Sequence, residues 1–273
     1  MSRASPYTHN ILVFDSGVGG LSIVSHLREQ LPSTAIQYLA DNALFPYGEL
    51  NDEVLVPRVV ALIASSCEHW NIDIVVIACN TASTLALPAL RDKLSIPVVG
   101  VVPAIKPAAQ CSSNKVIGLL ATNGTVSRAY TDELIADFAK DCQIIRVGSS
   151  TLVALIEAKM RGEDIPQQTY TEILKPLREH IGWDALDTVV LACTHFPLAK
   201  QQLSAAAPDV SHWVDSGDAV ARRVKHLLTS IKEHPQADLQ YAYFTNIDTV
   251  NPFLRQQLLD FGFSQALSWR FEH

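Results

Sequence analysis

The sequence predicts an α/β protein of two pseudo-symmetric domains, each a mostly parallel sheet flanked by helices. Short β-branched apolar runs alternate with segments of helical period, and one strand motif recurs in the second half of the chain. The chain has 273 residues, of which 48% are hydrophobic, enough to bury two cores of ordinary size. We expect residues 10–103 with 214–273 to form the first domain and residues 104–213 to form the second.

The predicted strands are mostly continuous apolar runs, which is typical of strands buried on both faces. They are Ile11–Phe14, Ala35–Ala40, Ile74–Ala78, Pro97–Val102, Val116–Leu120, Gln143–Val147, Thr188–Ala192 and Ser211–Val214. Helical period and composition predict helices over Gly20–Gln30, Leu50–His69, Ser83–Leu94, Ser127–Lys140 and Gln167–His180. In sheets of this kind, ligands bind beyond the carboxyl ends of the strands.

The repeated motif runs from Asp73 to Cys79 and again from Asp187 to Cys193, so that the second cysteine follows the first by 114 residues (193 − 79). The same offset carries the strand ending near Val101 onto the strand ending near Asp215. Each half therefore delivers one cysteine from the carboxyl end of a buried strand, and a cleft between the two units is the expected site. The alternative is coincidence, because the shared letters also describe any buried strand followed by a small residue.

Charge and hydropathy exclude several classes of protein. The formal net charge is −7, so the sequence predicts no basic surface for nucleic acid or an acidic membrane. No stretch approaches the roughly 20 apolar residues of a membrane-spanning helix, and the apolar run Ile11–Phe14 is too short for a signal peptide. We expect a cytoplasmic protein.

The five cysteines show no C-x-x-C spacing, which argues against a disulfide framework and against a structural zinc site. Reduced thiols are therefore expected. Cys67, Cys111 and Cys142 do not follow strand ends with polar turns, and a packing or surface role is expected for them. The histidines lack ligand spacing and no lysine stands out as a cofactor anchor, so neither a metal nor a cofactor is predicted.

Donor-rich turns follow both remaining cysteines. Asn80 and Thr81 follow Cys79, Thr194 follows Cys193, and a helix-like segment comes next in each case. The first turn of a helix presents free N–H groups and a partial positive charge, which hold anions and favour a thiolate. These turns can hold a carboxylate without any arginine.

Three further loops are candidate site segments, each with a structural alternative. Asp15 begins a glycine-rich turn that fits a dinucleotide loop poorly, because a carboxylate would stand where a pyrophosphate needs donors. Asp15 can partner an ammonium or orient an acid or base, or it can cap the following helix. The loops Asp41–Gly48 and Thr122–Thr125 follow the second strand of the first half and the first strand of the second half. Turn formation and helix capping are the alternatives for them.

Two acid–base groups on opposite sides of a carbon centre are what inversion of that centre by proton transfer requires. Cys79 and Cys193 meet this requirement, one as thiolate and the other as thiol. Because a free thiol is only slightly ionised at neutral pH, each needs a partner that manages its proton. Asp15 and His195 are the nearest candidates by motif, and a structural histidine is the alternative for His195.

Taken together, these segments resemble the glutamate racemases of the aspartate/glutamate racemase family. The resemblance runs in order from Ile11 to about Asp218. It is carried by Phe14–Gly20, Asp41 with Pro46–Gly48, Cys79–Ala82, Thr122–Thr125 and Cys193–Pro197.

The resemblance implies cofactor-independent interconversion of L- and D-glutamate, with D-glutamate supplied to peptidoglycan. It implies that Cys79 takes the α-proton of D-glutamate and Cys193 that of L-glutamate. Asp15 and His195 would assist the thiols, with Asp41 and Glu157 as further polar groups. Implied substrate contacts are Asp15, Ser16, Pro46, Tyr47, Gly48, Asn80, Thr81, Thr122, Thr125 and Thr194.

Two alternatives stay open. An aspartate racemase uses the same chemistry but usually carries Glu where this chain has His195, so the run after Cys193 favours glutamate. A non-catalytic binding or protein-inhibiting module on the same fold would be indicated by a missing cysteine or a replaced Asp15, and neither is seen. A homodimer is left open, with no surface for it identified.

Overall fold

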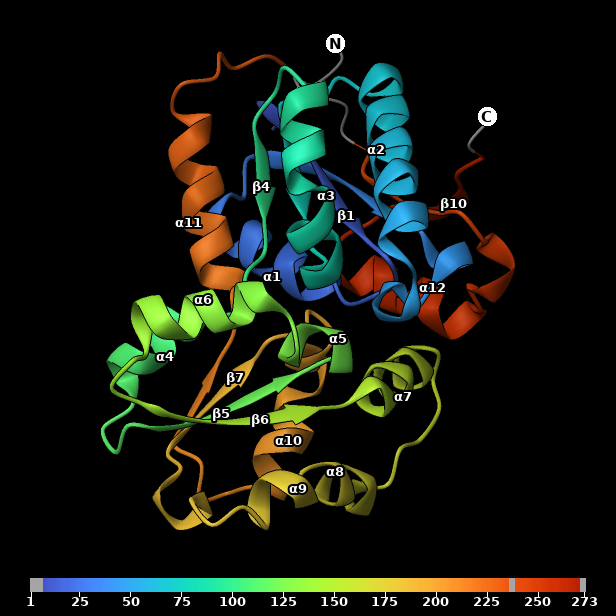
Figure 1. The fold of residues 1–273 in the computed structure, drawn as a ribbon. Coiled ribbons are helices and arrows are strands. Elements are labelled where there is room, and N and C mark those ends of the chain that lie inside the picture. The colour runs from blue at the N-terminus through green and yellow to red at the C-terminus, as the bar shows by residue number, and fades with distance from the viewer. Residues whose placement is uncertain (1–6, 236–238, 271–273) are drawn as a thin grey trace. The chain divides into compact units, whose positions relative to one another are not determined.

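The computed structural model describes residues 7–235 and 239–270, which form two compact units (Figure 1). Unit 1 comprises residues 1–101 and 217–273, and unit 2 comprises residues 102–216. The chain passes between them at 101/102 and 216/217, where the sequence indicated 103/104 and 213/214. Val214 belongs to unit 2 because it pairs with Val190, and Ser216 Oγ donates to the Val102 carbonyl.

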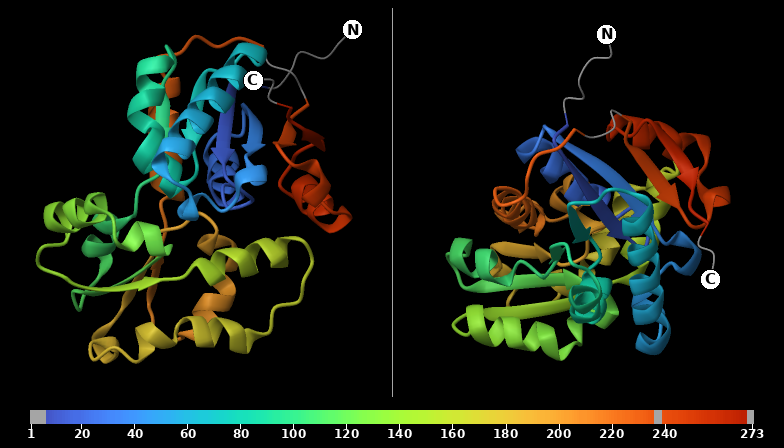
Figure 2. Two further views of the ribbon diagram at one scale, coloured as in Figure 1. Left: turned by 45° about the vertical axis from the view of Figure 1, so that its right-hand side comes forward. Right: turned by 90° about the horizontal axis from the view of Figure 1, so that it is seen from above.

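Unit 1 contains a parallel sheet whose described strands follow the order β10-β9-β2-β1-β3-β4 (Figure 2). The strands are β1 (His9–Asp15), β2 (Thr34–Ala40), β3 (Ile74–Ile77), β4 (Val98–Gly100), β9 (Tyr241–Phe244) and β10 (Gln265–Ser268). Helices α2 (Asp52–His69) and α3 (Asn80–Lys93) pack together on one face. Helices α1 (Leu21–Gln30) and α11 (Gly217–Leu228) contact each other, and α12 (Pro252–Asp260) packs beside β10.

Unit 2 contains a parallel sheet of order β6-β5-β7-β8. Its strands are β5 (Val116–Ala121), β6 (Gln143–Gly148), β7 (Thr188–Leu191) and β8 (His212–Val214). Helices α4 (Ile105–Cys111) and α6 (Ala129–Phe138) pack with β5 and β7 in one apolar cluster. The remaining helices are α5 (Asn123–Val126), α7 (Ser150–Met160), α8 (Gln167–Ile173), α9 (Lys175–Arg178) and α10 (Lys200–Ala206).

The predicted α/β class and repeat are confirmed. β3 and β4 shift by 114 residues onto β7 and β8, and the order β2-β1-β3-β4 in unit 1 matches β6-β5-β7-β8 in unit 2. β9 and β10 have no counterpart and were not predicted. Their residues alternate between buried and more exposed, unlike the continuous apolar runs of the central strands.

Two helix predictions need correction. α3 begins at Asn80, directly after the cysteine, and not at Ser83. The helix expected over Gln167–His180 is split into α8 and α9 at Leu174, because Pro176 cannot continue the hydrogen-bond ladder. The helix-like segment expected after Cys193 is a 3-10 helix that leads into α10.

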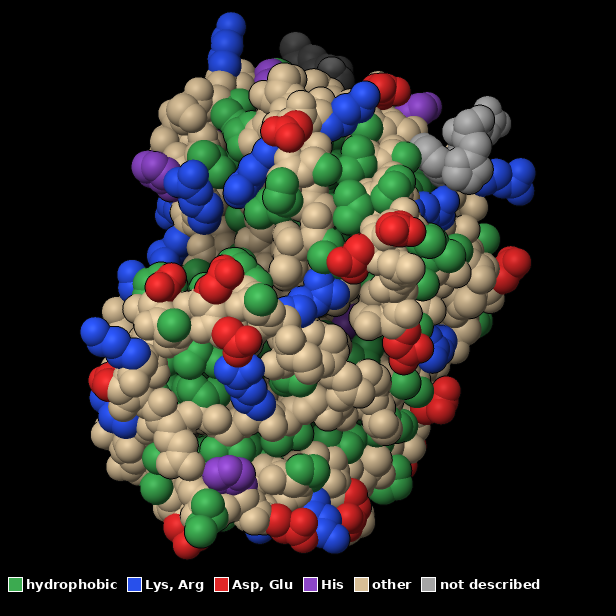
Figure 3. All heavy atoms as spheres, viewed as in Figure 1, with side chains coloured by type: hydrophobic (Ala, Val, Ile, Leu, Met, Phe, Trp, Pro, Cys, Tyr) green, Lys and Arg blue, Asp and Glu red, His purple; other side chains and the backbone are tan. Residues whose placement is uncertain are grey.

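Surface charge on the face drawn in Figure 3 is mixed, with acidic and basic side chains interspersed. That agrees with the net charge of −7. No helix among residues 7–235 and 239–270 is long and apolar enough to cross a membrane.

The aspartates that open the repeated motif fix the strands at their amino ends, away from the cysteines. Asp73 Oδ2 accepts from the Asn10 amide (2.8 Å) and its Oδ1 contacts His234 Nε2 (2.9 Å). Asp187 accepts from the Ser112 hydroxyl (2.7 Å), the Thr188 hydroxyl (2.8 Å) and two loop amides. Each carboxylate therefore ties its strand to the segment that enters the neighbouring strand β1 or β5.

The Asp187 contacts predict a pH-dependent loss of stability on Asp187→Asn. Burial alone would raise the pKa of Asp187, but hydrogen bonds from Ser112, Thr188 and the loop amides lower it overall. A lowered carboxylate pKa stabilises the fold above the ordinary value and ceases to do so as pH falls through the lowered value. We expect Asp187→Asn to reduce the free energy of unfolding by about 2 kcal/mol at neutral pH, measured by urea denaturation.

The difference should shrink as the pH falls toward 3. Asp209→Asn is the matched control, because Asp209 is exposed in the same unit. Equal unfolding free energies for wild type and Asp187→Asn at neutral pH would contradict the structural role of this carboxylate.

Candidate active site

Cys79 lies at the carboxyl end of β3 and is the N-cap of α3. The Ala78 amide donates to the Phe14 carbonyl (2.7 Å), so the strand stays paired up to the residue before the cysteine. Ser83 then closes the turn: its amide donates to the Cys79 carbonyl (2.8 Å), and its hydroxyl joins the Ile77 carbonyl (2.9 Å) to the Val101 amide (2.9 Å). The thiol is therefore held, mostly buried, beside the first-turn amides of a 14-residue helix.

Asn80 and Thr81 are buried in this first turn. Within the described chain, the Asn80 Oδ1 atom has no hydrogen-bond partner. A buried acceptor without a donor is unfavourable by about 1–3 kcal/mol, so a ligand N–H group would be accommodated here.

Asp15 ends β1, the strand next to β3, and is fully buried. Its Oδ1 accepts from the amides of Ser16 (2.5 Å) and Gly17 (3.3 Å). Its Oδ2 lies 3.0 Å from the point that a Cβ on Gly20 would occupy, so a side chain at Gly20 would displace the carboxylate. The N-cap of α1 is Gly20, so Asp15 is not the N-cap residue of this helix.

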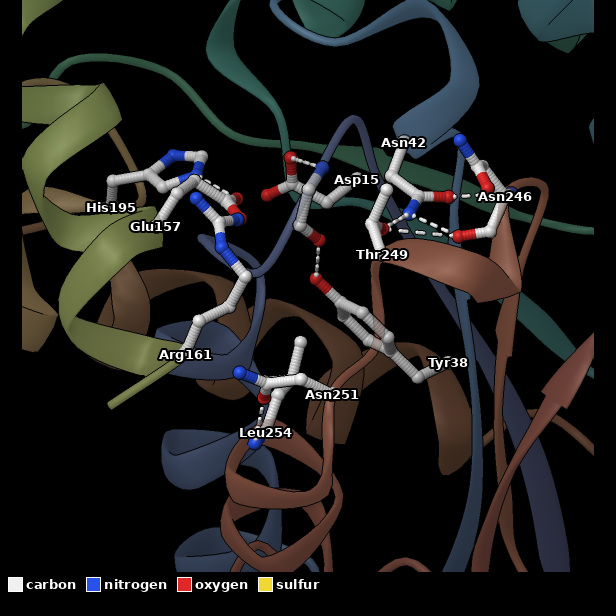
Figure 4. A network of polar contacts seen from close by, with 11 residues as sticks. Asp15, Tyr38, Asn42, Glu157, Arg161, His195, Asn246, Thr249, Asn251 and Leu254 are labelled. Atoms are coloured by element: carbon white, nitrogen blue, oxygen red, sulfur yellow. Dashed lines mark hydrogen bonds and ion pairs between the residues drawn. The ribbon is translucent and has the colours of Figure 1, made fainter. Parts of the chain in front are cut away.

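The turn after Asp15 is held from below by Tyr38, whose hydroxyl donates to the Gly17 carbonyl (2.6 Å; Figure 4). Tyr38 lies on β2, so this hydrogen bond fixes the turn relative to the sheet. These hydrogen bonds hold the segment Asp15–Gly17 in place, with the Asp15 carboxylate buried.

Asp41 is the anchor of the loop that follows β2. Its carboxylate binds Arg58 through both oxygens (2.9 and 3.0 Å) and accepts from the hydroxyls of Tyr47 (2.7 Å) and Thr245 (2.8 Å). Burial, then the charge of Asp41, raises the pKa of Tyr47, and the charge of Cys79 adds to this effect. Asp41 thus holds the buried Tyr47, with Pro46 and Gly48 beside it, near Cys79.

The C-terminal strands reinforce the same loop. Asn42 Nδ2 donates to the Asn246 carbonyl (2.8 Å) and to the Thr249 hydroxyl (2.7 Å), as Figure 4 shows. The Asn246 amide donates back to Asn42 Oδ1 (2.8 Å). The segment after β9, which the repeat in unit 2 lacks, therefore stabilises the Asp41 loop of unit 1.

Cys193 occupies in unit 2 the place that Cys79 occupies in unit 1. The Ala192 amide donates to the Leu120 carbonyl (2.8 Å), which matches the Ala78 contact, and the cysteine follows. Thr194 and His195 are buried in the next turn. The Phe196 amide donates to the Cys193 carbonyl (3.0 Å), and the 3-10 helix Phe196–Ala199 leads into α10.

His195 connects Cys193 to a carboxylate. Its Nδ1 lies 3.8 Å from Cys193 Sγ and its Nε2 lies 2.9 Å from Glu157 Oε1 (Figure 4). Burial alone would lower the pKa of His195, but the hydrogen bonds and negative charges of Cys193 and Glu157 together raise it well above its usual value. A protonated imidazole between a sulphur and a carboxylate is the arrangement that the structure favours.

Thr122 and Thr125 form a hydroxyl pair at the end of β5. Thr122 caps α5 by accepting from the Thr125 amide (3.3 Å), and the two hydroxyls are 2.9 Å apart. Thr131 fixes the turn by donating to the Thr125 carbonyl (2.7 Å). The helix-capping alternative is therefore correct for Thr122, and it leaves the paired hydroxyls available as ligand contacts.

The groups near the two cysteines differ, although their strands are equivalent. The Asp41 amide donates to the Asp15 carbonyl (2.9 Å), and the Ser149 amide donates to the Ala121 carbonyl (2.8 Å). Ala121 therefore stands in unit 2 where Asp15 stands in unit 1. Unit 2 instead has His195 in the turn after Cys193, in contact with Glu157 of α7.

The other three cysteines are free thiols outside these turns. Burial, followed by the charge of Glu68, raises the pKa of Cys67 to about 11. Burial and Asp141 likewise raise the pKa of Cys142. No group of three potential metal ligands occurs in the part of the chain that the structure describes.

The turns that carry both thiols lie within or beside a segment that matches a known family. The sequence profile of the Asp/Glu/Hydantoin racemase family matches residues 21–224. The chain belongs to this family. Among racemases of similar sequence, the glutamate racemase of Shewanella loihica is 48% identical over 96% of this chain and 96% of its own. That of Escherichia coli is 51% identical over 85% of this chain and 79% of its own.

A solved racemase structure has the same fold over nearly the whole chain. The crystal structure of Escherichia coli glutamate racemase with L-glutamate and the activator UDP-MurNAc-Ala matches with a TM-score of 0.91 and 44% identity. The match covers 97% of this chain and 100% of that chain. The fold expected for an Asp/Glu/Hydantoin racemase is thus confirmed for both units.

Sequence reasoning missed the residues that support the site from other helices. Arg58 beneath Asp41, and Lys159 and Arg161 on α7, carry no motif of their own. Glu157 was named only from the resemblance. Its spacing of 38 residues from His195 offers no local signal.

The raised pKa of His195 predicts how Glu157→Gln affects stability. A histidine whose pKa is raised on folding stabilises the protein below its ordinary pKa, and this contribution is lost as pH rises through the raised value. Because the pair is buried, we expect Glu157→Gln to reduce the free energy of unfolding by about 3 kcal/mol near pH 6. The loss should become smaller at alkaline pH, where His195 is neutral in both proteins.

Chemical denaturation of both proteins across this pH range makes the measurement. Glu179→Gln is the control, because Glu179 pairs with Lys175 at an exposed site of the same unit. A penalty for Glu157→Gln that does not change with pH would show that His195 is not the cation of this pair.

Proposed function

We propose that this protein is a cofactor-independent glutamate racemase that uses Cys79 and Cys193 as its two acid–base groups. One observation carries the proposal: the two thiols occupy equivalent strand ends of two repeated units. In the proposed mechanism, each thiol has its own partner for proton transfer. Asp15 serves Cys79, and His195 with Glu157 serves Cys193. The names of the related racemases support glutamate as the substrate.

The proposed reaction from L-glutamate starts at Cys193. Its thiolate takes the α-proton, so the Cα–H bond breaks, an S–H bond forms and the electron pair stays on the α-carbon. The Cys79 thiol then gives its proton to the opposite face of that carbon. From D-glutamate the same steps run with the roles exchanged, and the proposal requires both sulphurs to reach opposite faces of the substrate.

The partners supply what each sulphur needs. The imidazolium of His195 faces the Cys193 sulphur and provides a positive charge beside a thiolate. The buried Asp15 carboxylate lies on the neighbouring strand to Cys79 and can accept or return a proton there. No metal or cofactor takes part in the proposed steps.

Substrate contacts in the proposal come from the turns that surround the thiols. The amides and side chains of Asn80, Thr81 and Thr194 would hold the α-carboxylate, since helix first turns and hydroxyls bind anions. Asp15 would also face the α-ammonium. The further proposed contacts are Ser16, Pro46, Tyr47, Gly48, Thr122 and Thr125, with Asp41 positioning Tyr47.

Cellular role and assembly follow as parts of the proposal. D-glutamate made by the enzyme would supply peptidoglycan synthesis in the cytoplasm, where the five free thiols would stay reduced. A homodimer stays a prediction, which light scattering of the purified protein measures.

Aspartate racemisation is the competing activity, because the two-thiol chemistry is the same. The His195 side chain, paired with Glu157, favours glutamate over aspartate under the resemblance to glutamate racemases. A non-catalytic binding protein would not need a protonated histidine beside a cysteine.

The direct test is racemisation of pure protein with L-glutamate, followed by circular dichroism without pyridoxal phosphate or metal. L-aspartate is assayed in parallel. UDP-MurNAc-Ala, the activator in the Escherichia coli complex, is added to half of the samples so that an enzyme needing it is still detected. We expect racemisation of glutamate only; no racemisation in any sample would overturn the proposal.

Single substitutions test the two thiols. Cys79→Ser and Cys193→Ser should each lower kcat by at least about 1000-fold, because a serine hydroxyl is a far weaker acid than a thiol and is not ionised to act as a base near neutral pH. Cys142→Ser is the control, since Cys142 lies outside both turns. Full activity in either catalytic variant would contradict the two-thiol mechanism.

A further inference from the structure

Arg161 adds one residue to the polar contacts that link Cys193, His195 and Glu157 in unit 2. Its Nη1 lies 3.2 Å from Glu157 Oε2, while the other oxygen of Glu157 lies 2.9 Å from His195 Nε2. The glutamate is 8% exposed and the arginine 34% exposed. Cys193, His195, Glu157 and Arg161 thus form a continuous series from the buried sulphur toward the surface. Figure 4 shows the last three of these residues.

We propose that Arg161 is a positioning residue for proton transfer at Cys193: it holds one oxygen of Glu157 so that the other faces His195. The inference rests on the proposed racemase function and deepens it.

The backbone fixes Arg161 at the place that this role requires. Arg161 is the C-cap of α7, and its amide donates to the carbonyls of Glu157 (3.2 Å) and Ala158 (3.0 Å). Gly162 follows with a φ of +93°, a conformation that glycine adopts without strain, and so ends the helix there. The guanidinium therefore returns along its own helix to the side chain one turn earlier.

A second contact joins α7 to the segment that follows His195. Lys159 Nζ donates to the Leu198 carbonyl (3.2 Å) and to Gln202 Oε1 (3.1 Å), which joins α7 to the 3-10 turn after His195. Because that contact also joins α7 to the turn after His195, the packing of the helix does not depend on Arg161 alone. Its contribution is the orientation and the charge of Glu157.

Electrostatics favour this assignment over a purely structural ion pair. In the hydrogen bond between His195 and Glu157, one proton can lie on either partner. A positive charge on the far oxygen of Glu157 favours the ionised carboxylate, which keeps the proton on His195 beside Cys193. The half-exposed position of Arg161 keeps the effect moderate, since solvent screens its charge.

Arg161→Met is the informative variant and Arg161→Lys the conservative one. We expect Arg161→Met to lower kcat about 10-fold for both enantiomers with a smaller change in KM, and Arg161→Lys to recover most of that loss. Lys175→Met is the matched control, because Lys175 forms an ion pair at the same i,i+4 spacing with Glu179 on α9.

Isotope effects separate positioning at Cys193 from a general loss of structure. In Arg161→Met, the step at Cys193 should become more rate-limiting. The kinetic isotope effect with α-deuterated L-glutamate should then rise, and that with α-deuterated D-glutamate should fall. A structural defect would change both in the same way, and the thermal midpoint is measured beside them.

The results distinguish failure of the Arg161 inference from failure of the proposed racemase function. Unchanged kcat and isotope effects in Arg161→Met, with an active wild type, would overturn the inference and leave the racemase function standing. Equal changes in both isotope effects, or no recovery with Arg161→Lys, would also overturn it. A wild type without glutamate racemisation would overturn the proposed function instead.

Discussion

Each unit depends on one parallel pair of strands buried on both faces, β1 with β3 in unit 1 and β5 with β7 in unit 2. Helices cover both faces of such strands, so each side chain there must be apolar or have a hydrogen-bond partner. Polar groups can stand only where the strands end. Cys79 and Cys193 follow this constraint, and so do Asp15 and the turns that carry donors.

The repetition of this strand pair gives two thiols in equivalent settings, but the supporting groups have diverged. Unit 1 keeps a carboxylate, Asp15, on the strand next to Cys79. Unit 2 has Ala121 at that position and places an imidazole, His195, on the cysteine's own turn, with Glu157 behind it. The substrate's two enantiomers are mirror images, whereas the two halves that would act on them are not, and unequal kinetic behaviour of the two directions is a natural consequence.

The fold and the two thiols were predictable because their signals are local. Continuous apolar runs predict buried strands. The repeat of Asp73–Cys79 at Asp187–Cys193 identifies the equivalent strand ends in the two units. The supports were not predictable for the opposite reason: Arg58 reaches the site from a helix and Arg161 from the end of one. Thr245 reaches Asp41 from the segment after β9, more than 200 positions later. β9 and β10 were missed because they are short and lie outside the repeat that identified the other strands.

The central claim is that two opposed thiols, not one, move the α-proton. It is tested most directly by incubating the enzyme with L-glutamate in deuterated water and locating deuterium at early times by mass spectrometry after separating the enantiomers. Two opposed bases predict deuterium in the newly formed D-glutamate and almost none in the remaining L-glutamate, because Cys193 returns the proton that it took. Deuterium at equal levels in both enantiomers from the start, or D-glutamate that retains the original hydrogen, would contradict the account.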